Sequence, residues 1–150
     1  DLALDYTDQE ALLVHQGNGS YTSFEAHQWA PKLESNYFIS ARQQFRITLQ
    51  WNSLKAFEDR FWQVNPARLE HLRPVANPDN EPDDFVISRL TFQARYRWQI
   101  APLSDLFVVY TRGSNLPGNS FYTFQDLLEQ GWNDRIVDSF AIKLRYRFGV

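Results

Sequence analysis

Residues 89–99, RLTFQARYRWQ, alternate strictly between polar and apolar side chains. A strand turns successive side chains to opposite faces of a sheet, so this period of two predicts a strand with one apolar face and one basic face. A soluble protein buries the apolar face in its own core. A membrane β-barrel instead turns that face to lipid and turns the arginines toward its lumen.

Other segments show the same period. The clearest is 139–148, where Phe140, Ile142 and Leu144 alternate with Lys143 and Arg145. In 106–111 both sets of positions are largely apolar, so the facing of that strand is ambiguous. The remaining candidate strands are 45–51, a segment around 29–37, and a shorter run at 2–6 with 11–15 and 21–27 flanking a turn at 17–20. We expect Pro31 to weaken the 29–37 strand locally or to mark a bulge, because proline cannot donate to a ladder.

The connections between these strands alternate in length. Short links are expected at 40–43 and 101–104, and long ones at 58–84 and 113–138. Tight periplasmic turns and long external loops are typical of outer-membrane barrels. The second long connection contains a candidate helix over 120–131, with Asn119 or Ser120 as its cap and Gly131 as its stop. Its apolar face would consist of Phe121, Phe124 and Leu128.

Composition excludes several classes of protein. Mean hydropathy is −0.49, and no apolar run approaches the ~20 residues of a membrane helix. The absence of cysteine excludes disulfides, thiolate catalysis and cysteine metal sites. A net charge of −3 gives no reason to expect a nucleic-acid partner. The absence of methionine means that residue 1 is not a translation start, so we expect a matured protein or a piece of a longer one.

Two features favour lipid over a protein core on the apolar face. The clearest strands run for about the 9–11 residues that cross a bilayer, whereas soluble strands average about 5–6. The apolar faces are also rich in the aromatic residues that favour the lipid–water boundary. The expected interface aromatics are Trp29, Tyr37, Trp51, Tyr96, Trp98, Tyr110, Tyr146 and Phe148. A soluble sandwich or a lipocalin-like barrel is the alternative, since the strands of both also alternate between polar and apolar side chains.

About six strands are countable, whereas membrane barrels begin at eight. An open sheet in lipid would leave unpaired backbone groups, each costing several kcal/mol. We therefore expect the remaining strands to come from an N-terminal fragment or from a separate chain.

The run RLTFQARYRWQIAPLSDLFVVYTRG, followed by IKLRYRF, resembles the C-terminal end of a bacterial outer-membrane family of unassigned function. The segment SNYF…FRITLQWNSLKAF is also similar to that family. Its members join an N-terminal domain similar to carbohydrate-binding family nine to a large C-terminal β-barrel. The resemblance spans about residues 5–148 and implies a Gram-negative outer membrane, with the sugar-binding-like domain and the earlier strands absent here. The last strand resembles the signal that the barrel-assembly machinery reads, although Gly149 and Val150 follow Phe148. The family supplies no catalytic residues to carry over.

Candidate chemistry centres on basic residues. Twelve of the fifteen cationic residues are arginine, and a basic stripe can make a pore prefer anions. The lumen-lining basic candidates are Arg46, Arg89, Arg95, Arg97, Lys143, Arg145 and Arg147. The alternative is that they pair with carboxylates of other strands or of a plug, because unpaired buried charge is costly.

His15, His27 and His71 are far apart and match no catalytic motif. His71, beside Glu70 in an expected loop, leaves a rim hydrolase as an alternative, although a solvated histidine is the simpler interpretation. We assign no catalytic or metal-binding residue and expect no cofactor.

The sequence thus predicts an all-β fold: the C-terminal portion of an antiparallel transmembrane β-barrel, occupying all of 1–150 without a second domain. It would have about six strands, long extracellular loops and one short loop helix. The predicted function is a channel or membrane anchor in the bacterial outer membrane that serves binding or uptake of an extracellular solute, with carbohydrate as the candidate. The alternative is a structural half-barrel closed or plugged by another chain. The expected partners are membrane lipid, the remaining strands and the assembly machinery.

Overall fold

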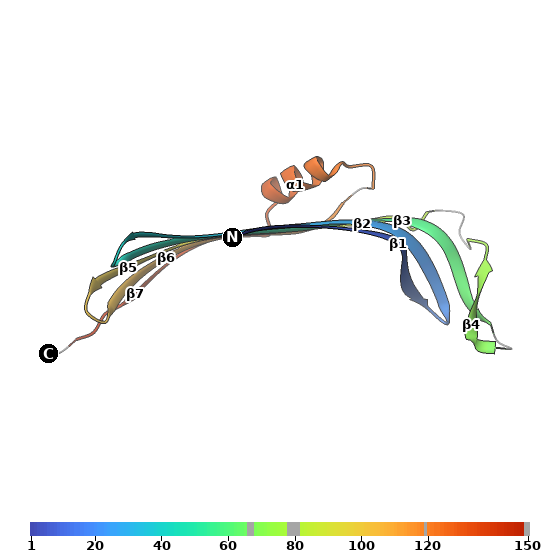
Figure 1. Cartoon of the computed structure of the whole chain (residues 1–150), viewed down its shortest axis with the longest axis horizontal. Helices are drawn as coiled ribbons and strands as arrows, with labels where there is room; N and C mark the ends of the chain where they lie inside the picture. Colours follow the sequence, from blue (N-terminus) through green and yellow to red (C-terminus); the bar gives the residue numbers. More distant parts are fainter. Residues whose placement is uncertain (66–67, 78–81, 119, 149–150) are drawn as a thin grey trace.

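The computed structural model describes residues 1–65, 68–77, 82–118 and 120–148. They form one antiparallel sheet with a single short helix on one face (Figure 1). The elements are β1 (Leu2–Gly17), β2 (Ser20–Ser40), β3 (Gln43–Asn65), β4 (Arg68–Val75), β5 (Phe85–Ala101), β6 (Ser104–Gly118), α1 (Phe124–Asn133) and β7 (Val137–Arg145). The strand order is β1-β2-β3-β5-β6-β7, with β4 pairing with β3 off this path.

The sheet is not closed into a barrel: β1 and β7 each have a strand neighbour on one side only within the described residues. The antiparallel, mostly-β fold and the short helix confirm the prediction at this coarser level. The predicted count of about six strands is one fewer than the seven strands that the described residues form. No helix in the described part of the chain is long and apolar enough to cross a membrane.

The three tight turns were predicted correctly. The β1–β2 hairpin turns through Gly17, Asn18 and Gly19, all with positive φ, as expected where glycine and asparagine relieve a left-handed backbone. Short links also join β2 to β3 and β5 to β6, at 40–43 and 101–104. Both of these hairpins lie at the same end of the sheet (Figure 1).

The predicted long loop at 58–84 was largely wrong, because β3 continues to Asn65 and β4 follows it. The loop at 113–138 is likewise shortened by β6, which runs to Gly118. Pro31 marks no bulge, because the register of β2 with β3 is the same on both sides of it, but Ala30 and Pro31 have no paired residue on β3. β3 and β6 therefore continue well beyond the segments 45–51 and 106–111 from which strands were predicted.

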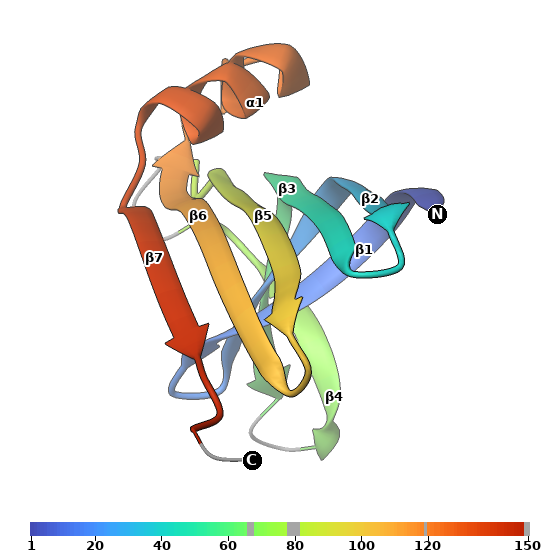
Figure 2. The same cartoon turned by 90° about the vertical axis from the view of Figure 1, so that its left-hand side faces the viewer.

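The register places the two sets of alternating side chains on opposite faces. Trp51, Leu90 and Ser114 are successive cross-strand partners on β3, β5 and β6, and they lie on the face that carries α1. Farther along this face the partners Phe45, Tyr96 and Val108 continue the apolar set. Both ends of the sheet curve away from α1 (Figure 1), and Figure 2 shows β5, β6 and β7 side by side with α1 on one side of them.

The helix begins later than predicted. Its N-cap is Thr123, whose side chain accepts a hydrogen bond from the Asp126 amide while the Asp126 carboxylate accepts one from the Thr123 amide. This capping box fixes the start at Phe124 and excludes Ser120 as the cap, while Asn119 lies outside the described residues. Gly131 is inside the helix, which ends at Asn133.

The helix packs through Leu127, which is buried, rather than through the predicted Leu128, and Phe121 precedes the helix and is exposed. Small residues allow this close approach. A Cβ added at Gly118 would lie 2.7 Å from Leu127 Cδ2, and one added at Gly131 would lie 3.3 Å from Ser114 Oγ. The indole of Trp51 donates to Ser88 Oγ at 3.0 Å, and that hydroxyl donates to the Leu127 carbonyl at 3.2 Å. The buried Ser114 Oγ, by contrast, has no hydrogen-bond partner among the described residues.

Two small cores lie on opposite faces of the sheet. The first, under α1, contains Trp51, Val86, Leu90 and Leu127. The second contains Phe24, Ala26 and Ala56. Because the β3–β5 register is continuous, Ala56 points to the face opposite Trp51. Protein therefore covers both faces at this part of the sheet.

Candidate functional site

The basic residues gather on the face opposite α1, toward the 40–43 and 101–104 hairpins. Arg46 and Arg95 are direct cross-strand partners, and the next row along contains Arg97, Phe107 and Lys143. We call the five cationic residues on adjoining rows the basic cluster: Arg46, Arg95, Arg97, Lys143 and Arg145. The structure thus brings together five of the seven candidates from β3, β5 and β7.

The other two candidates lie apart from the basic cluster. Arg89 is on the same face of β5 but pairs with Asn52 and Asn115, well along the strand. Arg147 follows the end of β7, and its backbone amide donates to Ser104 Oγ at 3.1 Å.

A buried carboxylate, Asp105, joins three strands at this end. Its side chain is only 2% exposed and accepts from Arg97 Nε at 3.1 Å and Nη2 at 3.0 Å. It also contacts Arg145 Nη2 directly. The carboxylate therefore links β5, β6 and β7 and offsets part of the basic charge.

Sequence reasoning missed this role, because Asp105 follows a proline turn and resembles an ordinary turn residue. Only the register of β5 and β7 with β6 reveals its partners.

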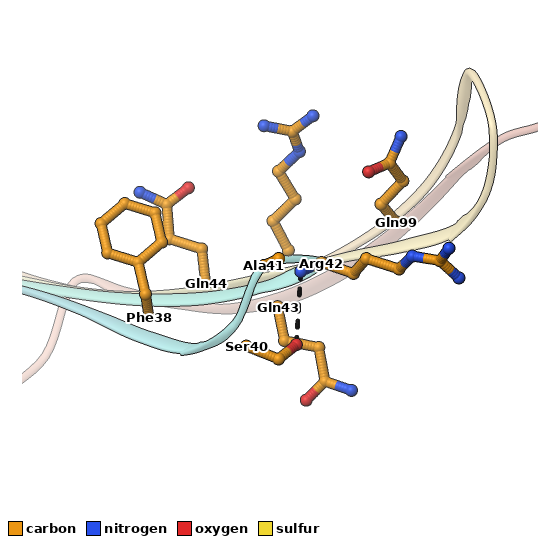
Figure 3. Close-up of a pocket in the computed structure, with 8 residues that line it drawn as sticks. Phe38, Ser40, Ala41, Arg42, Gln43, Gln44 and Gln99 are labelled. Carbon is orange, nitrogen blue, oxygen red and sulfur yellow. Dashed lines mark hydrogen bonds between the residues drawn. The ribbon is translucent and has the colours of Figure 1, made fainter.

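A pocket beside the β2–β3 turn adjoins the basic cluster. Phe38, Gln44 and Gln99 rise from one side of the ribbon, whereas Gln43 points to the other (Figure 3). The turn is held by Ser40, whose hydroxyl accepts from the Arg42 amide at 3.3 Å. A second pocket lies next to it on the same face and shares Gln44 and Arg97 with it. This second pocket is lined by Gln44, Arg46, Arg95, Arg97 and Phe107.

The predicted interface aromatics fall into two groups on the α1 face, separated along the strands. Tyr37, Tyr96, Trp98 and Tyr146 are near the short hairpins, and Trp29 and Trp51 are near α1. Tyr110 lies between the groups, 6.1 Å from Phe92 between ring centroids. Phe148 follows β7, is exposed and packs edge-on against Tyr146, with 5.0 Å between the ring centroids.

Trp51 departs from its expected position at a lipid boundary. It is 6% exposed, because α1 covers it and Phe124 packs edge-on against it. The same helix covers Leu90 and packs Trp132 at 5.5 Å from Phe92. The rest of the β5 row, ending at Trp98, which is 40% exposed, lies beyond the helix. One end of the Leu90–Trp98 row is therefore protein-covered and the other is open.

The histidines do not assemble into a catalytic set. His27 lies on β2 with Nδ1 at 2.9 Å from Asp8 Oδ1, a cross-strand pair that sequence reasoning missed. His15 on β1 packs against Tyr21. His71, expected in a loop, is exposed on β4. Within the described ranges no group of three or more His, Asp or Glu side chains is placed to hold a metal ion.

Comparison with protein-family models, with curated proteins and with solved structures finds no match for this chain. Its function is therefore inferred from the chemistry of the two faces of the sheet.

Proposed function

We propose that this sheet is part of the wall of a bacterial outer-membrane β-barrel, with the α1 face toward lipid and the basic cluster toward an aqueous lumen. One observation carries the proposal: a broad apolar surface is exposed on one face, directly behind a charged one. On β7, Phe140 is 65%, Ile142 63% and Leu144 59% exposed. At the opposite edge of the sheet, on the same face, Leu2 and Leu4 of β1 and Tyr37 of β2 are exposed too. Contiguous apolar surface of this extent requires a cover, and lipid supplies one.

The length of the apolar row on β5, whose Leu90 end is covered by α1, supports this proposal. From Trp98 to Leu90, β5 rises about 26 Å at ~3.3 Å per residue. A barrel's apolar band is about 25 Å tall, and strand tilt shortens the rise across the membrane to about 20 Å. The lipid boundary would then fall near α1, so that the helix and the two small cores lie at or outside the external surface of the membrane.

The open edges of β1 and β7 require further strands. In hydrocarbon each unpaired backbone group costs several kcal/mol, so an open sheet does not persist there. We infer that an N-terminal portion or a separate chain closes the barrel, and that the assembly machinery inserts it through the 139–148 strand. The completed barrel would serve as a channel or anchor for binding or uptake of an extracellular solute. Carbohydrate is suggested by the family resemblance alone.

Flotation with liposomes tests the membrane assignment. Together with the strands that close the barrel, the protein refolded with preformed liposomes should float with them and should resist extraction by alkaline carbonate, which removes peripheral proteins. Recovery in the soluble fraction without detergent would contradict the proposal. Single-channel conductance of the protein together with its closing strands then separates the two roles, because a channel conducts and an anchor does not.

A structural wall without transport is the second candidate. The observation that favours it is the Asp105 network, in which Arg97 and Arg145 are already paired within the chain. If all basic residues were similarly paired by the closing strands, the lumen would be filled rather than open, and conductance would be absent.

A further inference from the structure

The basic cluster contains two kinds of cation. Arg97 and Arg145 share Asp105, so their charge is partly neutralised. Arg46 and Arg95 instead oppose one another directly across β3 and β5. Like charges placed opposite each other on neighbouring strands destabilise a sheet. Such an arrangement is expected to attract an anion between the two guanidinium groups.

No carboxylate of the described residues lies within ion-pair distance of either arginine, although Glu34 interacts with Arg46 at longer range. Among the described residues, neither Arg46 nor Arg95 forms an ion pair, and Arg95 only donates to the neutral Gln93 at 3.1 Å. Glu34 and Asp1 line a neighbouring pocket with Arg46. The Glu34 carboxylate is held at 3.0 Å by Lys32, however, and lies beyond ion-pair distance of Arg46.

Arg46 and Arg95 line one pocket together, and three strands contribute residues to it. Gln44 and Arg46 come from β3, Arg95 and Arg97 from β5, and Phe107 from β6. The Gln44 amide already donates to Asn36 at 2.7 Å, and Arg97 lies over the Phe107 ring at 6.0 Å. The free donors of the pocket are therefore mainly the guanidinium groups of Arg46 and Arg95.

We propose that Arg46 and Arg95 form an oxyanion-binding site that takes the carboxylate or phosphate group of a small solute. Guanidinium groups present planar pairs of N–H donors that match the oxygens of such groups. The site's role in uptake rests on the proposed function and would make the solute anionic. Binding of the anion itself does not depend on the membrane assignment.

Calorimetric titration of the full chain in detergent, at constant ionic strength, tests the site. Inorganic phosphate and glucuronate are the two oxyanion probes, and neutral glucose is the control ligand. Arg46→Gln and Arg95→Gln should each weaken phosphate binding about tenfold or more, as expected for loss of charge-assisted hydrogen bonds. Arg60→Gln, which removes the same charge from β3 at an exposed pair with Asp59, should change it less than about twofold.

A second measurement separates binding from folding. In chloride buffer, Arg95→Gln should raise the thermal midpoint or leave it unchanged, because it removes the like-charge contact. If that variant does not fold, Arg95→Lys keeps the charge, loses the planar fork and should still weaken phosphate binding.

The proposal is overturned if the unmodified chain binds neither oxyanion, or if Arg60→Gln weakens binding as much as Arg95→Gln. Binding of glucuronate but not phosphate identifies a carboxylated solute, and the reverse identifies a phosphorylated one. Phosphate binding by a chain that does not float with liposomes would support this site while rejecting the proposed function.

Discussion

At the scale of single residues, the position of α1 depends on small side chains beneath it. A Cβ at Gly118 would lie 2.7 Å from Leu127 Cδ2 and 2.9 Å from Val86 Cγ1, and both partners are buried. We expect Gly118→Ala to destabilise the protein by about 1–3 kcal/mol through overpacking. Denaturant titration measures this change. Gly113→Ala is the matched control, because its Cβ would meet only ordinary contacts at 3.5 Å and beyond.

Asp105 is the residue on which the strand ends near the short hairpins depend. Asp105→Asn removes the carboxylate that Arg97 and Arg145 share, leaving their charges on one face without compensation. The denaturation midpoint should fall clearly further than in Asp59→Asn, which breaks the exposed pair with Arg60 and keeps an amide oxygen that can accept from Ser23 Oγ. Equal shifts in the two variants would show that the Asp105 network contributes no more than a surface ion pair.

Alternation in the sequence was enough to predict which residues share a face, since β-strands impose that period wherever they form. Arg46, Arg95 and Arg97 are accordingly on one face and Trp98 on the other. The pairing of Asp105 with two arginines, and of Asp8 with His27, depends on cross-strand register. Register is set by turn geometry and packing across distant segments, so local patterns could not supply it.

At the scale of elements, the start of α1 depends on its capping box. Thr123→Ala should destabilise the helix by about 0.5–2 kcal/mol, the usual cost of losing an N-cap side chain. Amide hydrogen exchange over 124–133 reports this change directly. Ser120→Ala is the control, since the structure places no cap at that residue. Similar loss of protection in both variants would contradict the assignment of Thr123.

The same capping box predicts a pH dependence. Hydrogen bonds from the Thr123 side chain and backbone hold the pKa of Asp126 below its ordinary value of 3.8. A carboxyl whose folded pKa is lowered stabilises the folded state above its unfolded pKa, and this stabilisation is lost as pH falls through the folded pKa. Protection of the α1 amides should therefore fall below about pH 4. Asp126→Asn should show weaker protection at neutral pH and lose this acid-dependent step.

Element boundaries were the least predictable part of the fold. The helix was expected to begin at Ser120 because that residue type caps well, but Thr123 with Asp126 three residues later satisfies two backbone donors at once. β4 was overlooked because its Pro74 and the prolines around it suggested a loop. That strand pairs with β3 only on one side, where proline is tolerated.

At the scale of the whole molecule, the sheet combines two environments. Near α1 both faces are covered by protein, whereas toward the short hairpins one face is apolar and open and the other is charged. A soluble sandwich would cover the open face with a second sheet, which the described residues do not contain. Lipid on this face is the central claim of the proposed function.

Spin-label accessibility on β7 tests that claim most directly. The chain contains no cysteine, so Ile142→Cys and Lys143→Cys each provide one labelling site, on neighbouring residues that face opposite sides of the sheet. In liposomes that contain the protein together with its closing strands, a label at 142 should be more accessible to oxygen, which concentrates in lipid, and one at 143 should be more accessible to a polar nickel chelate. Preferential access of the nickel chelate to residue 142, or protection of that label from both reagents, would contradict the account.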